Sequence, residues 1–175
     1  IYMLNREQNE AYYWVQSKRL IPFWESDFPL RLVFHWWFKN TSLQPVHSGA
    51  VGTAEGGVLL VGKGGSGKST STLSCVNSSL KVAGDDYVLI DAEKSHVYSL
   101  FSLTKANEKS LNLLTNLRIS KSDLAPPIED KYRICLDAHF KNSLVHEMPL
   151  KAILTPEVCD IEESEIVPTS KAKAL

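Results

Sequence analysis

The stretch that most constrains this chain is Gly62-Lys63-Gly64-Gly65-Ser66-Gly67-Lys68-Ser69. It fits the pattern G-x-x-x-x-G-K-[ST], the phosphate-binding loop of many nucleotide-using proteins. Glycines let the backbone curl so that its N–H groups point inward as a nest for phosphate oxygens. Lys68 can reach the β- and γ-phosphates of a nucleotide, and the Ser69 hydroxyl can ligate Mg²⁺. We therefore expect residues 62–69, together with Thr70, to bind ATP and Mg²⁺.

The sequence on either side of the loop supplies the context that the motif needs. Residues 57–61 are typical of a buried strand, and residues 69–76 are typical of a helix with Leu73 and Val76 on one face. Strand, glycine-rich loop and helix in this order distinguish a phosphate site from an ordinary glycine-rich turn.

Length and composition narrow the classes of protein. A chain of 175 residues fits one domain, or one domain plus a fragment. The net charge of −1 argues against a nucleic-acid partner, and no apolar stretch has the length of a membrane span. The three cysteines form no C-x-x-C motif, which fits a reducing cytoplasm. The histidines lack the spacing of zinc ligands, so no zinc site is expected.

Residues 1–45 form an aromatic-rich segment, with eleven of the sixteen Phe, Trp and Tyr residues. We expect a helix over residues 9–20 and a second one, capped by Ser26 or Asp27, that ends at Phe38. Helices that pack on the sheet or on another subunit explain the aromatics better than base stacking, because positive charge is lacking. A homo-oligomer is compatible with this expectation.

Residues 46–175 are expected to form the nucleotide-binding domain. Strands are predicted over residues 45–51, 58–61, 80–83, 87–90, 97–101, 132–136 and 150–154, with a helix over 107–117. Strands with interspersed helices predict an α/β fold with a mixed sheet and flanking helices. The acidic residues 156–168 are typical of a solvated loop, and residues 172–175 resemble the middle of an element, which suggests truncation at the C-terminus.

Asp85 and Asp86 are the candidate chemical groups outside the loop. They lie seventeen and eighteen residues after Lys68, a distance that suits a helix, a short strand beside the loop strand and a turn back to the loop mouth. One acid could hold Mg²⁺ and the other could accept a proton from a hydroxyl. An Asp-rich turn is the alternative, and His47 on the preceding strand could likewise be structural.

Residues 46–51, 57–69 and 82–86 together resemble the catalytic domain of HPr kinase/phosphorylase. That family shows a His on the preceding strand, a similar glycine-rich loop and a Val-Ala-Asp-Asp-like turn in the same order. Residues 149–156 and the Trp-rich stretch before His47 are similar to a divergent branch of bacterial serine kinases related to it.

The resemblance implies a P-loop kinase fold of the HPr kinase and phosphoenolpyruvate carboxykinase type, with ATP- and Mg²⁺-dependent phosphoryl transfer to a hydroxyl. It implies that Lys68 holds the phosphates, that Ser69 and Asp86 hold the metal, that Asp85 is the general base and that His47 neighbours the transferred phosphate. The family's E-x-R-G segment has no clear equivalent here, so the expected acceptor is a peptide, protein or small molecule other than HPr.

Two other functions stay open from the sequence. Residues 132–136 form an apolar strand followed by Asp137, which in ordinary P-loop ATPases would be the acid that supports the metal. In that case Asp137 replaces Asp86, and the chain is an ATPase or a switch. A nucleotide-binding module that has lost catalysis is the third alternative.

Overall fold

The computed structural model describes residues 1–160 and 163–170, and the prediction for residues 172–175 lies outside them. The strands are β1 (Tyr2–Asn5), β2 (Glu10–Tyr13), β3 (Leu43–Val46), β4 (Gly49–Thr53), β5 (Gly56–Leu60), β6 (Lys81–Gly84), β7 (Val88–Asp91), β8 (His96–Ser99), β9 (Leu103–Asn107), β10 (Lys131–Cys135) and β11 (Glu147–Leu154). The α-helices are α1 (Phe23–Asp27), α2 (Arg31–Phe38), α3 (Lys68–Ser74), α4 (Glu108–Leu113) and α5 (Leu136–Phe140). Short 3-10 helices are Lys18–Leu20, Thr115–Leu117, Lys121–Asp123 and Lys141–Ser143.

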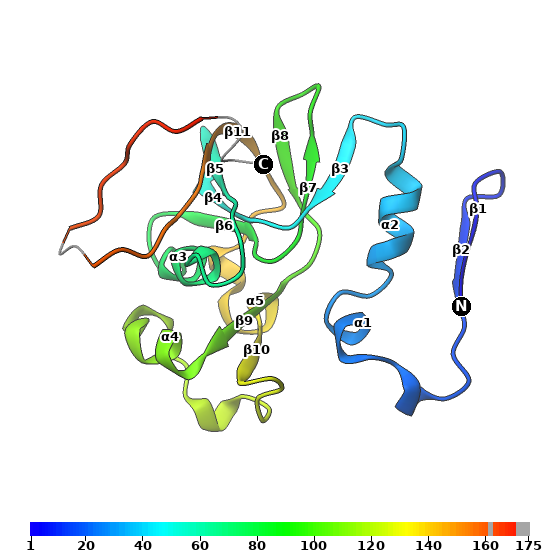
Figure 1. Ribbon diagram of the computed structural model, residues 1–175, viewed down its shortest axis with the longest axis horizontal. Coiled ribbons are helices and arrows are strands. Elements are labelled where there is room, and N and C mark those ends of the chain that lie inside the picture. The colour runs from blue at the N-terminus through cyan, green and yellow to red at the C-terminus, as the bar shows by residue number, and fades with distance from the viewer. Residues whose placement is uncertain (161–162, 171–175) are drawn as a thin grey trace.

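Within these residues, the main sheet has seven strands in the order β3-β7-β8-β11-β5-β4-β6. The pair β11–β5 is parallel and the other pairs are antiparallel, so the sheet is mixed. In Figure 1, α2 lies beside β3, the hairpin β1–β2 lies on the far side of α2 and α1 lies below it, whereas α3 and α4 lie toward the other end of the molecule. The predicted mixed α/β architecture with flanking helices is confirmed.

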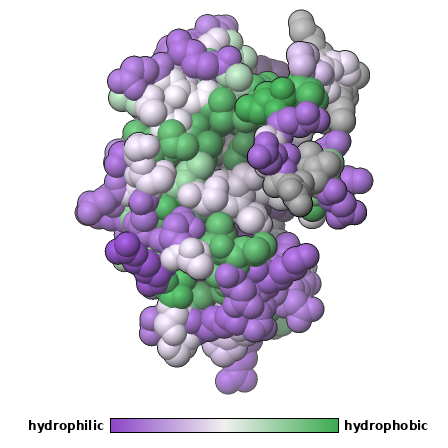
Figure 2. All heavy atoms as spheres, turned by 90° about the vertical axis from the view of Figure 1, so that its left-hand side faces the viewer, coloured by the Kyte–Doolittle hydropathy of each residue, from purple (hydrophilic) through white to green (hydrophobic). Residues whose placement is uncertain are grey.

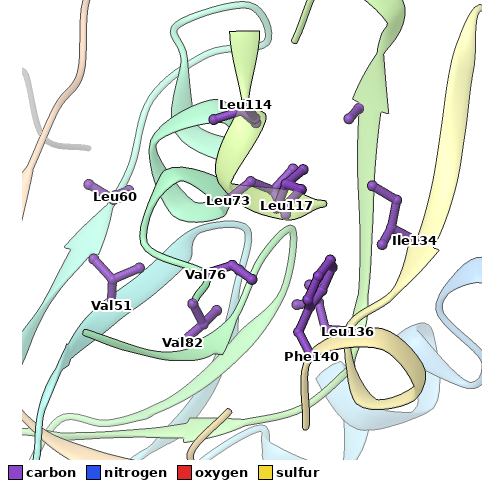
Figure 3. Close-up of a cluster of buried hydrophobic side chains, with 11 residues drawn as sticks. Val51, Leu60, Leu73, Val76, Val82, Leu114, Leu117, Ile134, Leu136 and Phe140 are labelled. Atoms are coloured by element: carbon purple, nitrogen blue, oxygen red, sulfur yellow. The ribbon is translucent and has the colours of Figure 1, made fainter. Parts of the chain in front are cut away.

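The core beneath the phosphate loop explains why α3 packs where it does. Val51, Leu60 and Val82 project from the sheet toward Leu73 and Val76, which follow the loop, as Figure 3 shows. The rest of this cluster comes from β9, β10, α5, Leu114 directly after α4, and the 3-10 turn at Leu117. Burial of these side chains holds the strand before the loop against the helix after it. Each Å² of apolar surface removed from water contributes about 25 cal/mol of stabilising free energy.

Several predicted elements differ from the observed ones. The helix predicted over residues 9–20 is wrong, because residues 10–13 pair with β1 and Tyr13 stacks on Tyr2 at 4.6 Å between ring centroids. The strand predicted over 45–51 divides into β3 and β4, which pair with different neighbours. The strand β6 is not beside the loop strand β5, since β4 lies between them.

The strands β9 and β10 form a separate antiparallel pair. The sequence predicted β10 but not β9, because residues 103–107 (Leu-Thr-Lys-Ala-Asn) contain few strongly apolar residues. This pair lies below the main sheet in Figure 1 and brings Thr104 and Lys105 to the acidic turn after β6.

Candidate functional site

The phosphate loop connects β5 directly to α3, so the strand–loop–helix context of the motif is confirmed. Gly65 has φ of 82° and Gly67 has φ of 98°, a left-handed conformation that side chains with a Cβ rarely adopt. A Cβ on Gly64 or Gly65 would meet no heavy atom within 4 Å. The backbone at Gly64 and Gly65 therefore faces open space, which leaves room for an anion to approach the N–H groups of the loop.

Lys68 is the first residue of α3 and is buried although it is charged. Its Nζ donates hydrogen bonds to the carbonyl oxygens of Gly62, at 2.6 Å, and Lys63, at 3.1 Å. The ammonium group is thus held inside the curve of the loop. This position is suited to phosphate oxygens that enter the same curve.

The neighbouring loop residues have different surroundings. Thr70 Oγ1 is 3.1 Å from Ser110 Oγ on α4, so this hydroxyl joins the two helices. Ser66 Oγ is buried without a hydrogen-bond partner among the described residues. We infer that Ser66 lies in the wall of the loop and that Thr70 supports it.

Asp85, directly after β6, is almost fully buried, with 1% of its surface exposed. Its Oδ2 accepts a hydrogen bond from the Thr104 hydroxyl at 2.5 Å, whereas its Oδ1 has no partner among the described residues. Burial and the neighbouring charge of Asp86 raise the pKa of Asp85, and the hydroxyls of Thr104 and Ser69 lower it by less. A buried carboxylate with a free oxygen therefore lies next to Ser69.

Asp86, the next residue, has a left-handed backbone conformation with φ of 58°. Its Oδ1 lies 3.4 Å from His47 Nε2, and its Oδ2 lies 3.9 Å from Lys105 Nζ. The His47 side chain is 51% exposed, so this pair faces solvent. The two adjacent acids thus have different partners: Thr104 and Ser69 for Asp85, and His47 and Lys105 for Asp86.

This arrangement favours the reverse of the division of roles that the resemblance implies, and either division is compatible with the two acids in the sequence. Asp86 was expected beside Ser69 and Asp85 beside the acceptor hydroxyl, but Ser69 acts on Asp85 and His47 contacts Asp86. Of the two acids predicted to return to the loop, Asp85 interacts with the loop residue Ser69, whereas Asp86 interacts with His47 and Lys105.

The residues around Asp85 fit a magnesium ion bound together with a nucleotide. Thr72 Oγ1 and Asp85 Oδ1 are both buried without hydrogen-bond partners in the described part of the chain, and Ser69 is adjacent. Across residues 1–160 and 163–170, no three His, Cys, Asp or Glu side chains cluster as a metal site. Mg²⁺ in such sites takes one or two protein oxygens, with phosphate and water supplying the others.

Asp137, the rival metal-supporting acid, lies elsewhere. It is on α5 and lines a cavity of about 400 Å³ with Lys141 and His146. The strand before it, β10, pairs only with β9 within the described residues and is not part of the main sheet. No residue of the phosphate loop lines this cavity.

The sequence did not indicate Thr104, Lys105 or Tyr87 as site residues. Tyr87 stacks on His47 at 5.1 Å between ring centroids, and its hydroxyl accepts a hydrogen bond from Arg31 at 2.6 Å. The position of Tyr87 directly after Asp86 was the available signal. The sequence contains no such signal for Thr104 and Lys105, because their contacts with Asp85 and Asp86 depend on where β9 lies relative to the acidic turn.

No protein-family model matches the chain, and no curated protein is significantly similar to it. No helix in the described residues is long and apolar enough to cross a membrane. The face on the side of α3 and α4 shows apolar residues interspersed among hydrophilic ones (Figure 2).

Proposed function

We propose that this chain transfers a phosphoryl group from ATP, with Mg²⁺, to a hydroxyl group of an acceptor. The observation that carries the proposal is the pair of adjacent carboxylates at the phosphate loop. Asp85 lies beside Ser69, and Asp86 lies beside the exposed His47. A phosphate loop with one acid beside it and a second acid paired with an exposed histidine has the groups needed for both the metal and an acceptor.

On this proposal each residue has one role. The loop backbone and Lys68 bind the phosphates, and Ser69 and Asp85 hold Mg²⁺, directly or through water. The metal neutralises charge on the β- and γ-phosphates when it is bound. Asp86 orients the acceptor hydroxyl and takes its proton, and His47 fixes that carboxylate from the solvent side.

The same residues support a core of the HPr kinase and phosphoenolpyruvate carboxykinase type as the finer description of the fold. The order of His47, the phosphate loop and the acidic turn along the chain matches that family. The missing E-x-R-G segment favours an acceptor other than HPr, namely another protein, a peptide or a small molecule.

The position of Asp137 disfavours an ordinary P-loop ATPase. In such proteins the second acid follows a strand of the sheet that carries the loop, but β10 lies outside that sheet. A binding module without catalysis would retain the loop, yet it would have no need for two acids with partners as specific as Thr104 and His47.

The test is transfer of label from γ-labelled ATP. Purified protein incubated with Mg²⁺ and a cell lysate should give a labelled product, and Lys68→Ala should abolish it while the variant stays folded. HPr should not be labelled stoichiometrically. Nucleotide binding without any labelled product would leave only a binding module, and equal ATP affinity of wild type and Lys68→Ala would exclude the phosphate site.

A further inference from the structure

A cation from the amino-terminal segment lies next to the solvent side of the site. Arg31, the first residue of α2, donates from Nη1 to the Tyr87 hydroxyl at 2.6 Å. Its guanidinium also lies over the Tyr87 ring, 5.0 Å from the centroid. Tyr87 stacks on His47, and His47 contacts Asp86. The Tyr87 ring therefore links Arg31 to His47 and Asp86, the groups assigned to the acceptor.

The segment that carries Arg31 is firmly attached to the rest of the protein. Phe28 is buried against Tyr87 and Phe101, with ring centroids 5.1 and 5.4 Å apart. Asp27 receives two hydrogen bonds from Arg133, at 2.6 and 2.9 Å, and lies 3.0 Å from Lys105 Nζ. Arg31 is therefore presented in a fixed place, which lowers the entropic cost of binding a ligand.

The nearby acids are already engaged, but Arg31 is not paired with an acid. Asp27 is held by Arg133 and Lys105, and the carboxylate of Glu25 accepts hydrogen bonds from the Leu30 N–H and the Tyr2 hydroxyl. In the described part of the chain, no carboxylate lies within ion-pair distance of Arg31. A guanidinium has five N–H donors, so most of those on Arg31 remain available for a planar anion.

We propose that Arg31 and Tyr87 form a subsite for an anionic group of the acceptor, a carboxylate or phosphate close to the hydroxyl that is phosphorylated. This rests on the proposed function. Tyr87 orients the guanidinium, and Arg31 binds the anion in a forked geometry while Asp86 receives the hydroxyl. The acceptor class is thereby narrowed to acidic hydroxyl compounds, such as serine peptides with flanking Asp or Glu.

The test uses three matched sets of degenerate serine peptides, flanked by Asp and Glu, by Asn and Gln, or by Lys and Arg, with γ-labelled ATP. Wild type should label the acidic set about 10- to 100-fold faster than the amide set, as expected for a charge-assisted hydrogen-bonded pair. Arg31→Met should abolish this preference, and Arg31→Lys should restore part of it. Tyr87→Phe, which keeps the ring, should weaken it.

Arg19→Met is the matched control, because Arg19 is an exposed arginine of the same segment, in the 3-10 helix Lys18–Leu20. Equal labelling of the acidic and amide sets, no labelling of any set, or an unchanged preference in Arg31→Met would overturn the subsite. A loss of Mg-ATP affinity in Arg31→Met, by calorimetry, would assign Arg31 to the nucleotide and also overturn it. Failure of the proposed function is seen separately, as absent ATP binding or absent transfer in lysate.

Discussion

At the scale of single residues, Asp85 and Asp86 show how position sets chemistry. Both are ordinary aspartates in sequence, but Asp85 is buried with an unpaired oxygen and Asp86 is partly exposed between His47 and Lys105. An unpaired buried polar group costs folding free energy. A cation bound between Asp85 and Ser69 would explain why this unpaired carboxylate oxygen is buried.

We predict that Asp85→Asn stabilises the protein without Mg²⁺. Because the pKa of Asp85 is raised on folding, the folded state binds the proton more tightly than the unfolded chain. The free energy of unfolding should thus fall as pH rises from about 3.9, the ordinary pKa, through the higher pKa of the folded state. Asp85→Asn should remove this fall and gain about 1–3 kcal/mol at pH 7, measured by urea unfolding.

Asp91→Asn is the opposite control. Burial would raise the pKa of Asp91, but the Lys94 and Glu93 backbone N–H groups and the Ser42 hydroxyl lower it overall. Its stabilising contribution is present above the ordinary pKa and is lost as pH falls through the lower pKa of the folded state. Asp91→Asn should therefore destabilise at pH 7, and a destabilised Asp85→Asn would show that the Asp85 carboxylate is structurally needed.

We predict different kinetic defects for the two acids. Asp86→Asn should lower turnover by about 10²- to 10⁴-fold with nearly unchanged Mg-ATP affinity, because it removes the proton acceptor. Asp85→Asn should instead weaken the Mg²⁺ dependence of ATP binding, and Asp137→Asn should change neither. Calorimetry at several Mg²⁺ concentrations and label transfer measure both quantities. A metal defect confined to Asp137→Asn would contradict the assignment of both acids.

At the scale of elements, Asp27 on α1 joins the amino-terminal segment to β9 and β10. Its carboxylate is buried between Arg133 and Lys105, so the pair is only weakly screened by solvent. Burial would raise the pKa of Asp27, but the two cations lower it overall. The amino-terminal segment is therefore held by the buried ion pairs of Asp27, next to the aromatic contacts of Phe28.

We predict that Arg133→Met destabilises by about 3–5 kcal/mol, because Asp27 would lose its main partner while it remains buried. Hydrogen exchange should speed up in residues 1–42 more than in α3. Lys121→Met is the control, since its pair with Glu108 is exposed and should contribute little. Unchanged exchange in residues 1–42 would mean that apolar contacts alone hold the segment.

The elements also show what the sequence could and could not predict. The loop, β5 and α3 were predictable because glycine spacing and apolar periodicity are local signals. The hairpin β1–β2 and strand β9 were not, because they depend on partners such as Tyr2 for Tyr13. The hydrogen bond between Thr104 and Asp85 joins residues nineteen positions apart, and no local sequence pattern predicts it.

At the scale of the whole molecule, the site lies where three parts of the chain meet. The loop, the β6–β7 turn and the β9–β10 pair contribute Lys68, Asp85 and Thr104, and β11 runs parallel to the loop strand β5. A ligand in this place contacts several core elements at once. Its binding should consequently be coupled to unfolding of the entire sheet.

We predict that Mg-ATP raises the melting temperature and that Lys68→Ala abolishes this shift. At a ligand concentration of about 100 times Kd, binding to the folded state adds about 2.7 kcal/mol. For a chain of this size each kcal/mol corresponds to about 2–4 °C, so the shift should be about 5–11 °C. Differential scanning fluorimetry with and without Mg-ATP measures it. Lys39→Ala, an exposed residue outside the loop, should keep the full shift, and an equal shift in Lys68→Ala would mean that ATP binds somewhere other than the phosphate loop.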